Sequence, residues 1–178
     1  MIKTLTIKST YKNKWMEVFE DSVEFDNSEN GIYGYVKRHD GASLLIVNTN
    51  NEILLVNQYR YPIKSFQWGI PGGAIEENET PEDAVRREVR EETGLEVTNL
   101  ETMGCFYPLS SCSTEKDYLF IAHIDAKLPS ENPDEQHDEL FQEKKFVPIQ
   151  KALEMIDRNE ITDSNTAKAI QMLARRMK

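Results

Sequence analysis

The chain has 178 residues, of which 39% are hydrophobic and 29% are charged. This length allows one domain with a sizeable core and is short for two. The formal net charge of -10 argues against a surface that binds the backbone of duplex nucleic acid, because such surfaces depend on clustered cations. An acidic protein that handles phosphates would need divalent cations to bridge the like charges.

The N-terminal residues predict neither an export signal nor a membrane span. Residues 1–10 mix Lys3 and Lys8 with single apolar residues and contain no continuous apolar run. We therefore expect a cytoplasmic protein that binds no membrane. Cys105 and Cys112 have no metal-ligand spacing with a histidine, and we interpret them as reduced structural residues.

Apolar and polar residues alternate in two short segments near the start of the chain. Residues 15–20 and 21–25 are interpreted as two strands with a tight connection between them. They predict an N-terminal β-hairpin. Because an isolated hairpin is marginally stable, we expect this one to need an apolar surface.

The rest of the chain predicts a mostly β domain with one helix in the middle and two at the end. Residues 42–48 and 53–59 flank an Asn-rich turn, which is the pattern of a buried hairpin. Helical spacing indicates helices over residues 81–92, 149–157 and 164–177. Further strands are expected at residues 32–38, 96–107, 116–124 and 144–147. This order predicts an α/β/α sandwich around a mixed β-sheet.

The segment of residues 71–95 carries the strongest functional signal. Thr80 suits the N-cap of a helix, Pro81 suits the first helical position, and Asp83 can complete a capping box. Gly94 can end the helix in the left-handed conformation.

Within this helix the acidic residues gather beside the apolar stripe. At about 100° per residue, Glu88, Glu91 and Glu92 share one arc with the apolar residues. The three arginines of the helix fall on the other side, so we expect them not to pair with these carboxylates. Crowded carboxylates repel one another unless a multivalent cation compensates. Their oxygen atoms favour Mg²⁺, Mn²⁺ or Ca²⁺, and Mg²⁺ is the common partner of substrate phosphates.

This segment resembles the Nudix box, Gly-x5-Glu-x7-Arg-Glu-U-x-Glu-Glu-x-Gly-U, where U is apolar. It matches at every fixed position, namely Gly73, Glu79, Arg87, Glu88, Val89, Glu91, Glu92, Gly94 and Leu95. The resemblance implies the Nudix α/β/α sandwich, with the box forming a loop, a helix and a loop. It also implies metal ligation by Glu88 and Glu92, with help from Glu91 and the Gly72 carbonyl, and a structural tie between Arg87 and Glu79.

Other residues resemble the ADP-ribose and nucleoside-diphosphate-sugar pyrophosphatase branch of the family. They are Gln58-Tyr59-Arg60, Trp68, Pro71, Gly73, Ile75-Glu76, Tyr107-Pro108, Ser113 and Glu115. This resemblance implies Mg²⁺-dependent cleavage of a nucleotide sugar such as ADP-ribose to a nucleoside monophosphate and a sugar phosphate. Gly69 stands where the branch often has an acidic residue and Ser111 where it usually has glycine, so the base and the sugar stay open.

Three residues outside the box are candidates for substrate binding. Arg60 can clamp a phosphate or sugar with its guanidinium, or it can be a charge at the end of a strand. Trp68 can shape a substrate cleft or pack in the core. Glu115 matches the branch at the start of a strand, which implies a role near the substrate or metal. Tyr33 and Tyr35 alternate on one strand and are interpreted as sheet packing rather than as contacts to a base.

The catalytic base is expected in the acidic loop over residues 129–143 or within the helix itself, where Glu91 and Glu92 lie. Glu139 is the closest match to the branch by spacing, and Glu135 is the second choice. His137 is a weaker candidate, because Nudix enzymes more often use glutamate.

We therefore predict a single Nudix domain over residues 1–178, with a core over 36–178. The strands of residues 1–35 are expected to pair with a second subunit in a homodimer. Two alternatives stay open: hydrolysis of a dinucleoside polyphosphate, CoA or an RNA cap, and a non-catalytic nucleotide sensor. The intact carboxylate set disfavours the sensor, because a binding protein need not keep three mutually repelling acids.

Overall fold

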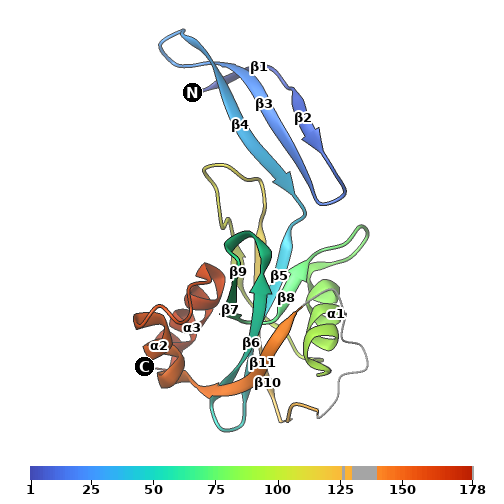
Figure 1. Ribbon diagram of the computed structural model, residues 1–178, viewed down its shortest axis with the longest axis vertical. Coiled ribbons are helices and arrows are strands. Elements are labelled where there is room, and N and C mark those ends of the chain that lie inside the picture. Colours follow the sequence, from blue (N-terminus) through green and yellow to red (C-terminus); the bar gives the residue numbers. More distant parts are fainter. Residues whose placement is uncertain (126, 130–139, 178) are drawn as a thin grey trace. The chain divides into compact units, whose positions relative to one another are not determined.

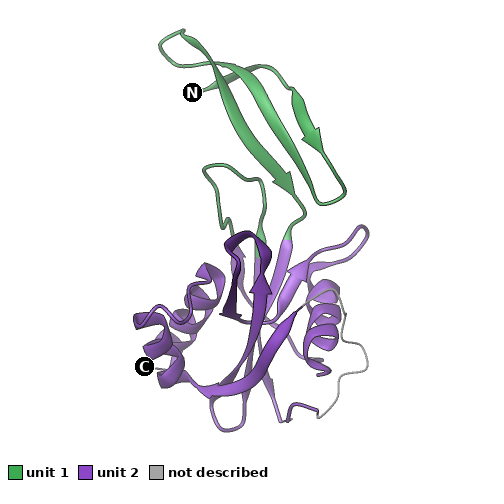
Figure 2. Cartoon of the chain, in the orientation of Figure 1, with its two compact units in different colours: residues 1–40, 106–117 green, residues 41–105, 118–178 purple. Residues whose placement is uncertain are grey.

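The computed structural model describes residues 1–125, 127–129 and 140–177 (Figure 1). It divides the chain into two compact units (Figure 2). Unit 1 comprises residues 1–40 and 106–117, and unit 2 comprises residues 41–105 and 118–178. None of the helices in the described part of the chain is long and apolar enough to cross a membrane.

Unit 1 is built on an antiparallel sheet whose central strand pairs with three others. These strands are β1 (Lys3–Thr6), β2 (Ser9–Lys12), β3 (Met16–Glu24) and β4 (Asn30–Arg38). Strand β4 pairs with β3 along its whole length, while β1 and β2 pair with its second and first halves respectively. Because a strand has two edges, β1 and β2 share the edge of β3 opposite to β4.

The predicted hairpin over residues 15–25 is wrong, since residues 16–24 form the single strand β3. Asp21 does not begin a turn. It is 6% exposed, and its carboxylate accepts a hydrogen bond from the Lys8 N–H at 3.2 Å, so a polar residue occupies an inward position of a continuing strand. The hairpin turn comes later, where Ser28 has the left-handed φ of 64° and the Phe25 N–H donates to the Glu29 carbonyl.

Unit 2 contains the sheet with strand order β11-β6-β5-β10-β9. Strand β7 also pairs with β6, and β8 also pairs with β5. The strands are β5 (Gly41–Asn48), β6 (Glu52–Arg60), β7 (Ser65–Gly69), β8 (Gly72–Ala74), β9 (Glu101–Phe106), β10 (Asp117–Ile124) and β11 (Phe141–Pro148). A 3-10 turn, η1 (Tyr61–Ile63), lies between β6 and β7.

Three helices in the described residues cover this sheet. In Figure 1, α1 (Pro81–Thr93) lies on one side of the sheet, and α2 (Ile149–Asp157) and α3 (Ser164–Arg176) lie on the other. The predicted α/β sandwich is confirmed, and the expected helices begin at the predicted residues. The strand expected over residues 96–107 begins only at Glu101, because Leu95 and Val97 pack into the core beside α1.

The core beneath α1 explains why the sequence of β5 is a continuous apolar run. Alternate residues of β5 belong to the cluster that also contains Ala84, Val85 and Val89 of α1. The residues between them, Leu45 and Val47, are also buried, so β5 is covered on both faces. This packing fixes the position of α1 against the sheet.

Candidate active site

The start and the end of α1 are set by local chemistry, as the sequence predicts. The Asp83 N–H donates to the Thr80 hydroxyl oxygen at 3.1 Å, and that hydroxyl donates to the Asp83 carboxylate at 2.6 Å. Pro81 occupies the first turn, where its missing N–H costs nothing. Gly94 has the left-handed φ of 72°, and its N–H donates to the Arg90 carbonyl at 2.8 Å.

The Glu92 side chain lies at the edge of the core. It is only 3% exposed, and its Oε2 accepts a hydrogen bond from the Gly72 N–H at 3.1 Å. Gly72 in turn pairs with Ser43 of β5. Gly72 has a φ of 153°, and a Cβ there would overlap the Ala42 carbonyl, so the position requires glycine. The buried carboxylate of α1 is therefore held against the first residue of β8.

Glu88 lies against the next residue of β8, Gly73. A Cβ at Gly73 would overlap the Glu88 carboxyl group. The absence of a side chain at Gly73 thus allows this carboxylate to touch the backbone. The glycine pair and two of the predicted metal ligands come together at one place.

Arg87 connects the remaining acids of the site. Its guanidinium donates to both carboxylate oxygens of Glu79 at 2.8 and 3.0 Å, which confirms the predicted tie. Its Nη1 also donates to Glu88 at 2.8 Å and to Glu91 at 3.1 Å. The Arg87 hydrogen bond is the main reason why the pKa of Glu79 lies below its ordinary value. Glu79 and then Glu88 raise the pKa of Arg87, against the opposing effect of burial.

The expectation that the arginines of α1 avoid its carboxylates is therefore wrong for Arg87. Arg87 stands at the edge of the cationic arc, about 40° from Glu91 by the helical count. Its long side chain crosses that gap, because residues four apart on a helix are neighbours.

The predicted metal ligands fit a hard divalent cation by their chemistry. Glu88, Glu91 and Glu92 supply carboxylate oxygens, and Gly72 can add a carbonyl oxygen, which is the donor set that Mg²⁺ and Mn²⁺ prefer. As the side chains stand, no three carboxylate, imidazole or thiol groups of the described residues converge closely enough to enclose an ion. Arg87 instead forms ion pairs with one carboxylate oxygen of Glu88 and one of Glu91. An arriving cation would compete with Arg87 for these oxygen atoms.

The other candidate residues lie on different elements. Arg60 is exposed at the end of β6, and Trp68 lies on β7 with the Lys145 ammonium 4.2 Å from its ring centre. Neither shares a hydrogen bond or ion pair with the α1 carboxylates in the described part of the chain. Glu115 belongs to unit 1, where it pairs with Arg38 at 3.1 Å. Burial raises the pKa of Glu115, against the opposing effect of Arg38.

The candidates for the base in the acidic loop, namely Glu135, His137 and Glu139, lie outside the described residues. One residue to which the sequence assigned no role is Gln58 on β6. It is 4% exposed, and its side-chain oxygen has no hydrogen-bond partner within the described residues. The sequence resemblance includes Gln58, but only the structure shows that its side chain is buried.

Comparisons with known proteins point to one family. The model of the NUDIX domain family matches residues 37–169. An ADP-ribose pyrophosphatase of Bacillus subtilis (strain 168) is 29% identical over 171 residues, which cover 96% of this chain and 91% of that protein. A methanol dehydrogenase activator of Bacillus methanolicus is 31% identical over 172 residues, with the same shares covered. A GDP-mannose pyrophosphatase of Yersinia enterocolitica is 33% identical over 144 residues, covering 75% of this chain and 73% of that protein.

A solved structure shares the fold. The crystal structure of an ADP compounds hydrolase superposes with a TM-score of 0.81 at 18% identity, covering 99% of this chain and 94% of that one. The fold and the box on α1 define the class of protein as a Nudix hydrolase. The chain belongs to the Nudix family.

Proposed function

We propose that this chain is a Mg²⁺-dependent pyrophosphohydrolase that cleaves the diphosphate of a nucleotide sugar such as ADP-ribose. The products are a nucleoside monophosphate and a sugar phosphate. The observation that carries the proposal is the convergence of Glu88 and Glu92 on Gly72 and Gly73 of β8. The relatives named for ADP-ribose and GDP-mannose support the substrate class.

The proposed ligands of the ion are Glu88, Glu91, Glu92 and the Gly72 carbonyl. When bound, Mg²⁺ would supply positive charge that offsets the negative charge developing in the reaction and would make a water molecule more acidic. The contribution of the protein is to hold this donor set in place. The Gly72 N–H fixes Glu92, and Arg87 fixes the carboxylates beside it.

Substrate contacts are proposed for three residues. Arg60 is exposed, and it can donate two parallel hydrogen bonds to a phosphate. Trp68 is partly exposed and can form one wall of a cleft. Glu115 would accept hydrogen bonds from the substrate in competition with Arg38.

Glu139 is the proposed base that takes the proton from the attacking water. A base acts in the transition state and adds little to ground-state binding. Glu139→Gln should therefore lower kcat by about 10²-fold with little change in KM. A comparable loss in Glu135→Gln alone would move the role to Glu135, and no loss in either variant would assign it to α1.

We also propose a cytoplasmic homodimer in which the strands of residues 1–35 contact the second subunit. Several large apolar side chains of these strands are exposed, among them Ile2, Leu5, Ile7 and Ile32. Such surfaces mark contacts with another protein. Light scattering tests the proposal, and a particle of 20.6 kDa at working concentration would refute it.

A substrate panel tests the proposed function. The purified chain is incubated with Mg²⁺ and ADP-ribose, GDP-mannose, a dinucleoside polyphosphate, CoA or capped RNA, and phosphate is measured after a coupled phosphatase. We expect release from the nucleotide sugars. Release from the other compounds alone would favour the alternative hydrolases.

The relative named as a methanol dehydrogenase activator favours one second candidate, a protein that binds a nucleotide and regulates a partner. Calorimetric binding of ADP-ribose without hydrolysis in Mg²⁺ or Mn²⁺ would support that candidate. It would contradict the proposed hydrolysis.

A further inference from the structure

Unit 1 contains a cavity whose charge is opposite to that of the protein as a whole. The cavity has a volume of about 230 Å³. Its lining residues are Lys12, Asn13, Lys14, Trp15, Met16, Glu17, Lys37, Arg38 and His39. Four permanent cations thus face one carboxylate, although the chain carries a net charge of -10.

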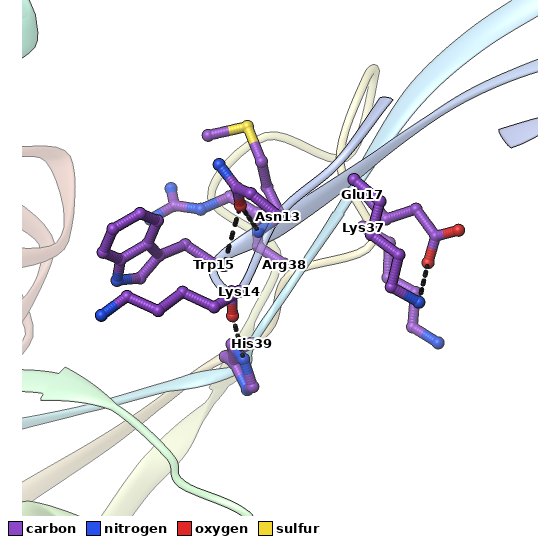
Figure 3. Close-up of a pocket in the computed structure, with 9 residues that line it drawn as sticks. Asn13, Lys14, Trp15, Glu17, Lys37, Arg38 and His39 are labelled. Carbon is purple, nitrogen blue, oxygen red and sulfur yellow. Dashed lines mark hydrogen bonds and ion pairs between the residues drawn. The ribbon is translucent and has the colours of Figure 1, made fainter. Parts of the chain in front are cut away.

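Two of these cations have hydrogen-bonding capacity left over. Lys14 has no carboxylate within ion-pair distance among the described residues, and its ammonium lies 4.3 Å from the centre of the Trp15 ring. Arg38 donates from Nη1 to Glu115 at 3.1 Å. The Nε and Nη2 groups of Arg38 make no hydrogen bond within the described part of the chain. In Figure 3, Lys14 runs beside Trp15, and Arg38 and His39 lie close to them.

Contacts between side chains and the backbone hold these groups near one another. The Trp15 N–H donates to the Asn13 side-chain oxygen at 2.8 Å, which fixes the turn between β2 and β3. A ring nitrogen of His39 is 3.4 Å from the Lys14 carbonyl oxygen, which links that turn to the end of β4. Lys14 of the turn between β2 and β3 and Arg38 at the end of β4 therefore line one cavity.

The positive field acts on the single acid of the lining. The pKa of Glu17 lies below its ordinary value, first through hydrogen bonds from Ser9 and Lys12 and then through the charges of Lys12 and Lys37. Lys12 pairs with Glu17 at 3.1 Å. This pair occupies one side of the cavity and leaves Lys14 and Arg38 for a ligand.

We propose that this cavity is an anion site that binds a dianionic phosphate monoester. A guanidinium matches phosphate oxygens with parallel donors, and an ammonium adds a point charge. The cavity is smaller than the clefts of about 300–1,000 Å³ that enclose whole ligands, so it suits one charged group rather than a complete nucleotide. The proposal goes beyond the proposed hydrolysis and does not rest on it.

The test uses the full chain in EDTA, and Trp15 as the reporter. Trp15 and Trp68 are the two tryptophans of the chain, so Trp68→Phe leaves the emission of Trp15 alone. A phosphate that draws Lys14 away from the ring will change this emission. The probes are AMP, ribose 5-phosphate, inorganic phosphate and adenosine. Calorimetry with the unsubstituted chain repeats the titrations in case Trp68→Phe does not fold.

We expect AMP and ribose 5-phosphate to bind with similar dissociation constants, while adenosine does not bind. A signal from inorganic phosphate equal to that of both esters would also support the site and would show that the ester group is not recognised. Lys14→Gln should weaken binding about fivefold to tenfold, and Arg38→Lys should weaken it by a similar factor, because the charge remains but the parallel donors of the guanidinium are lost. The control is Lys8→Gln, which removes one exposed cation of the same sheet outside the cavity and should leave binding unchanged within about twofold.

Three results would overturn the proposal. Adenosine that binds as tightly as AMP would show a site for the base. Equal weakening by Lys8→Gln and Lys14→Gln would show a diffuse field rather than a site. Absence of any signal with both phosphate esters at about 10 mM, a concentration that would reveal even weak non-covalent binding, would show that the cavity takes no such anion.

Discussion

Arg87→Gln is expected to destabilise unit 2, because one side chain holds three carboxylates. The substitution removes the two hydrogen bonds to Glu79 and the single bonds to Glu88 and Glu91. It also removes a bond to the Ala74 carbonyl at 3.0 Å. The side chains of these ion pairs are only 14–20% exposed, so water cannot fully replace what is lost.

The expected loss of stability lies between the values for exposed ion pairs and for buried ion pairs. Exposed ion pairs contribute about 0.2–1 kcal/mol, and breaking a buried pair costs about 3–5 kcal/mol. For partly buried groups we expect a loss of about 2–3 kcal/mol in the free energy of unfolding. In a chain of this size, that loss lowers the Tm by about 5–10 °C.

The assay is urea unfolding followed by circular dichroism, with Arg86→Gln as the matched control. Arg86 is on the same helix and carries the same charge, but it donates to two backbone carbonyls, of Glu82 and Thr98, and to no carboxylate of the described residues. We expect it to lose about 1 kcal/mol or less. The reasoning is refuted if both variants lose the same amount.

The difference between wild type and Arg87→Gln should also depend on pH. Arg87 lowers the folded-state pKa of Glu79 below its ordinary value of 4.5. The stabilisation from the Arg87–Glu79 pair is fully present above this value and is lost as the pH falls through the folded-state pKa of Glu79. The gap between the two proteins should therefore narrow in acid below about pH 4.5.

Three further outcomes follow from single positions. Gly73→Ala should reduce kcat by about 10²-fold, because its Cβ displaces the Glu88 carboxyl. A Cβ at Gly34 would make only an ordinary van der Waals contact with the Phe19 carbonyl oxygen at 3.9 Å, so Gly34→Ala should leave kcat unchanged in the same assay. Thr80→Ala should lower the free energy of unfolding in urea by about 1 kcal/mol through loss of the N-cap, and Thr80→Ser should restore most of it. Burial raises the folded-state pKa of Glu115, because it favours the protonated carboxyl group. Protonated Glu115 therefore stabilises the folded state in acid, and this stabilisation is lost as the pH rises through the folded-state pKa. Glu115→Gln should therefore gain stability relative to wild type between about pH 4 and pH 7, and an unchanged difference in urea unfolding would contradict this.

The sequence predicts α1 well because its signals are local. Thr80, Pro81 and Gly94 each act within a few residues, and the structure places all three where the sequence expects them. The segment Gly72–Ala74 gives no strand signal, since glycine is unfavourable in strands. Its pairing with β5 decides its conformation, and that partner is distant in the sequence.

The wrong sequence predictions concern side-chain contacts that the local pattern of residues does not show. Asp21 continues a strand because Lys8, thirteen residues earlier, donates to it. Arg87 reaches Glu91 because of the length of its side chain, which a count of angles around the helix ignores. The cationic cavity of unit 1 was not predicted, because Lys14 and Arg38 are far apart in the sequence and the sheet brings them together.

The central claim is that the carboxylates of α1 hold the divalent cation used in hydrolysis. The most direct measurement is the rate of ADP-ribose hydrolysis by Glu92→Gln and by Glu82→Gln, each across a range of Mg²⁺ concentrations. Glu92 is buried against Gly72 of β8, whereas Glu82 is exposed in the first turn of the same helix. We predict that wild type and Glu82→Gln lose their activity in EDTA and regain it with Mg²⁺. We predict that Glu92→Gln stays at least about 10²-fold slower at saturating Mg²⁺ while it keeps the wild-type circular dichroism spectrum. Turnover of Glu92→Gln near the wild-type rate, or hydrolysis that persists in EDTA, would contradict the account.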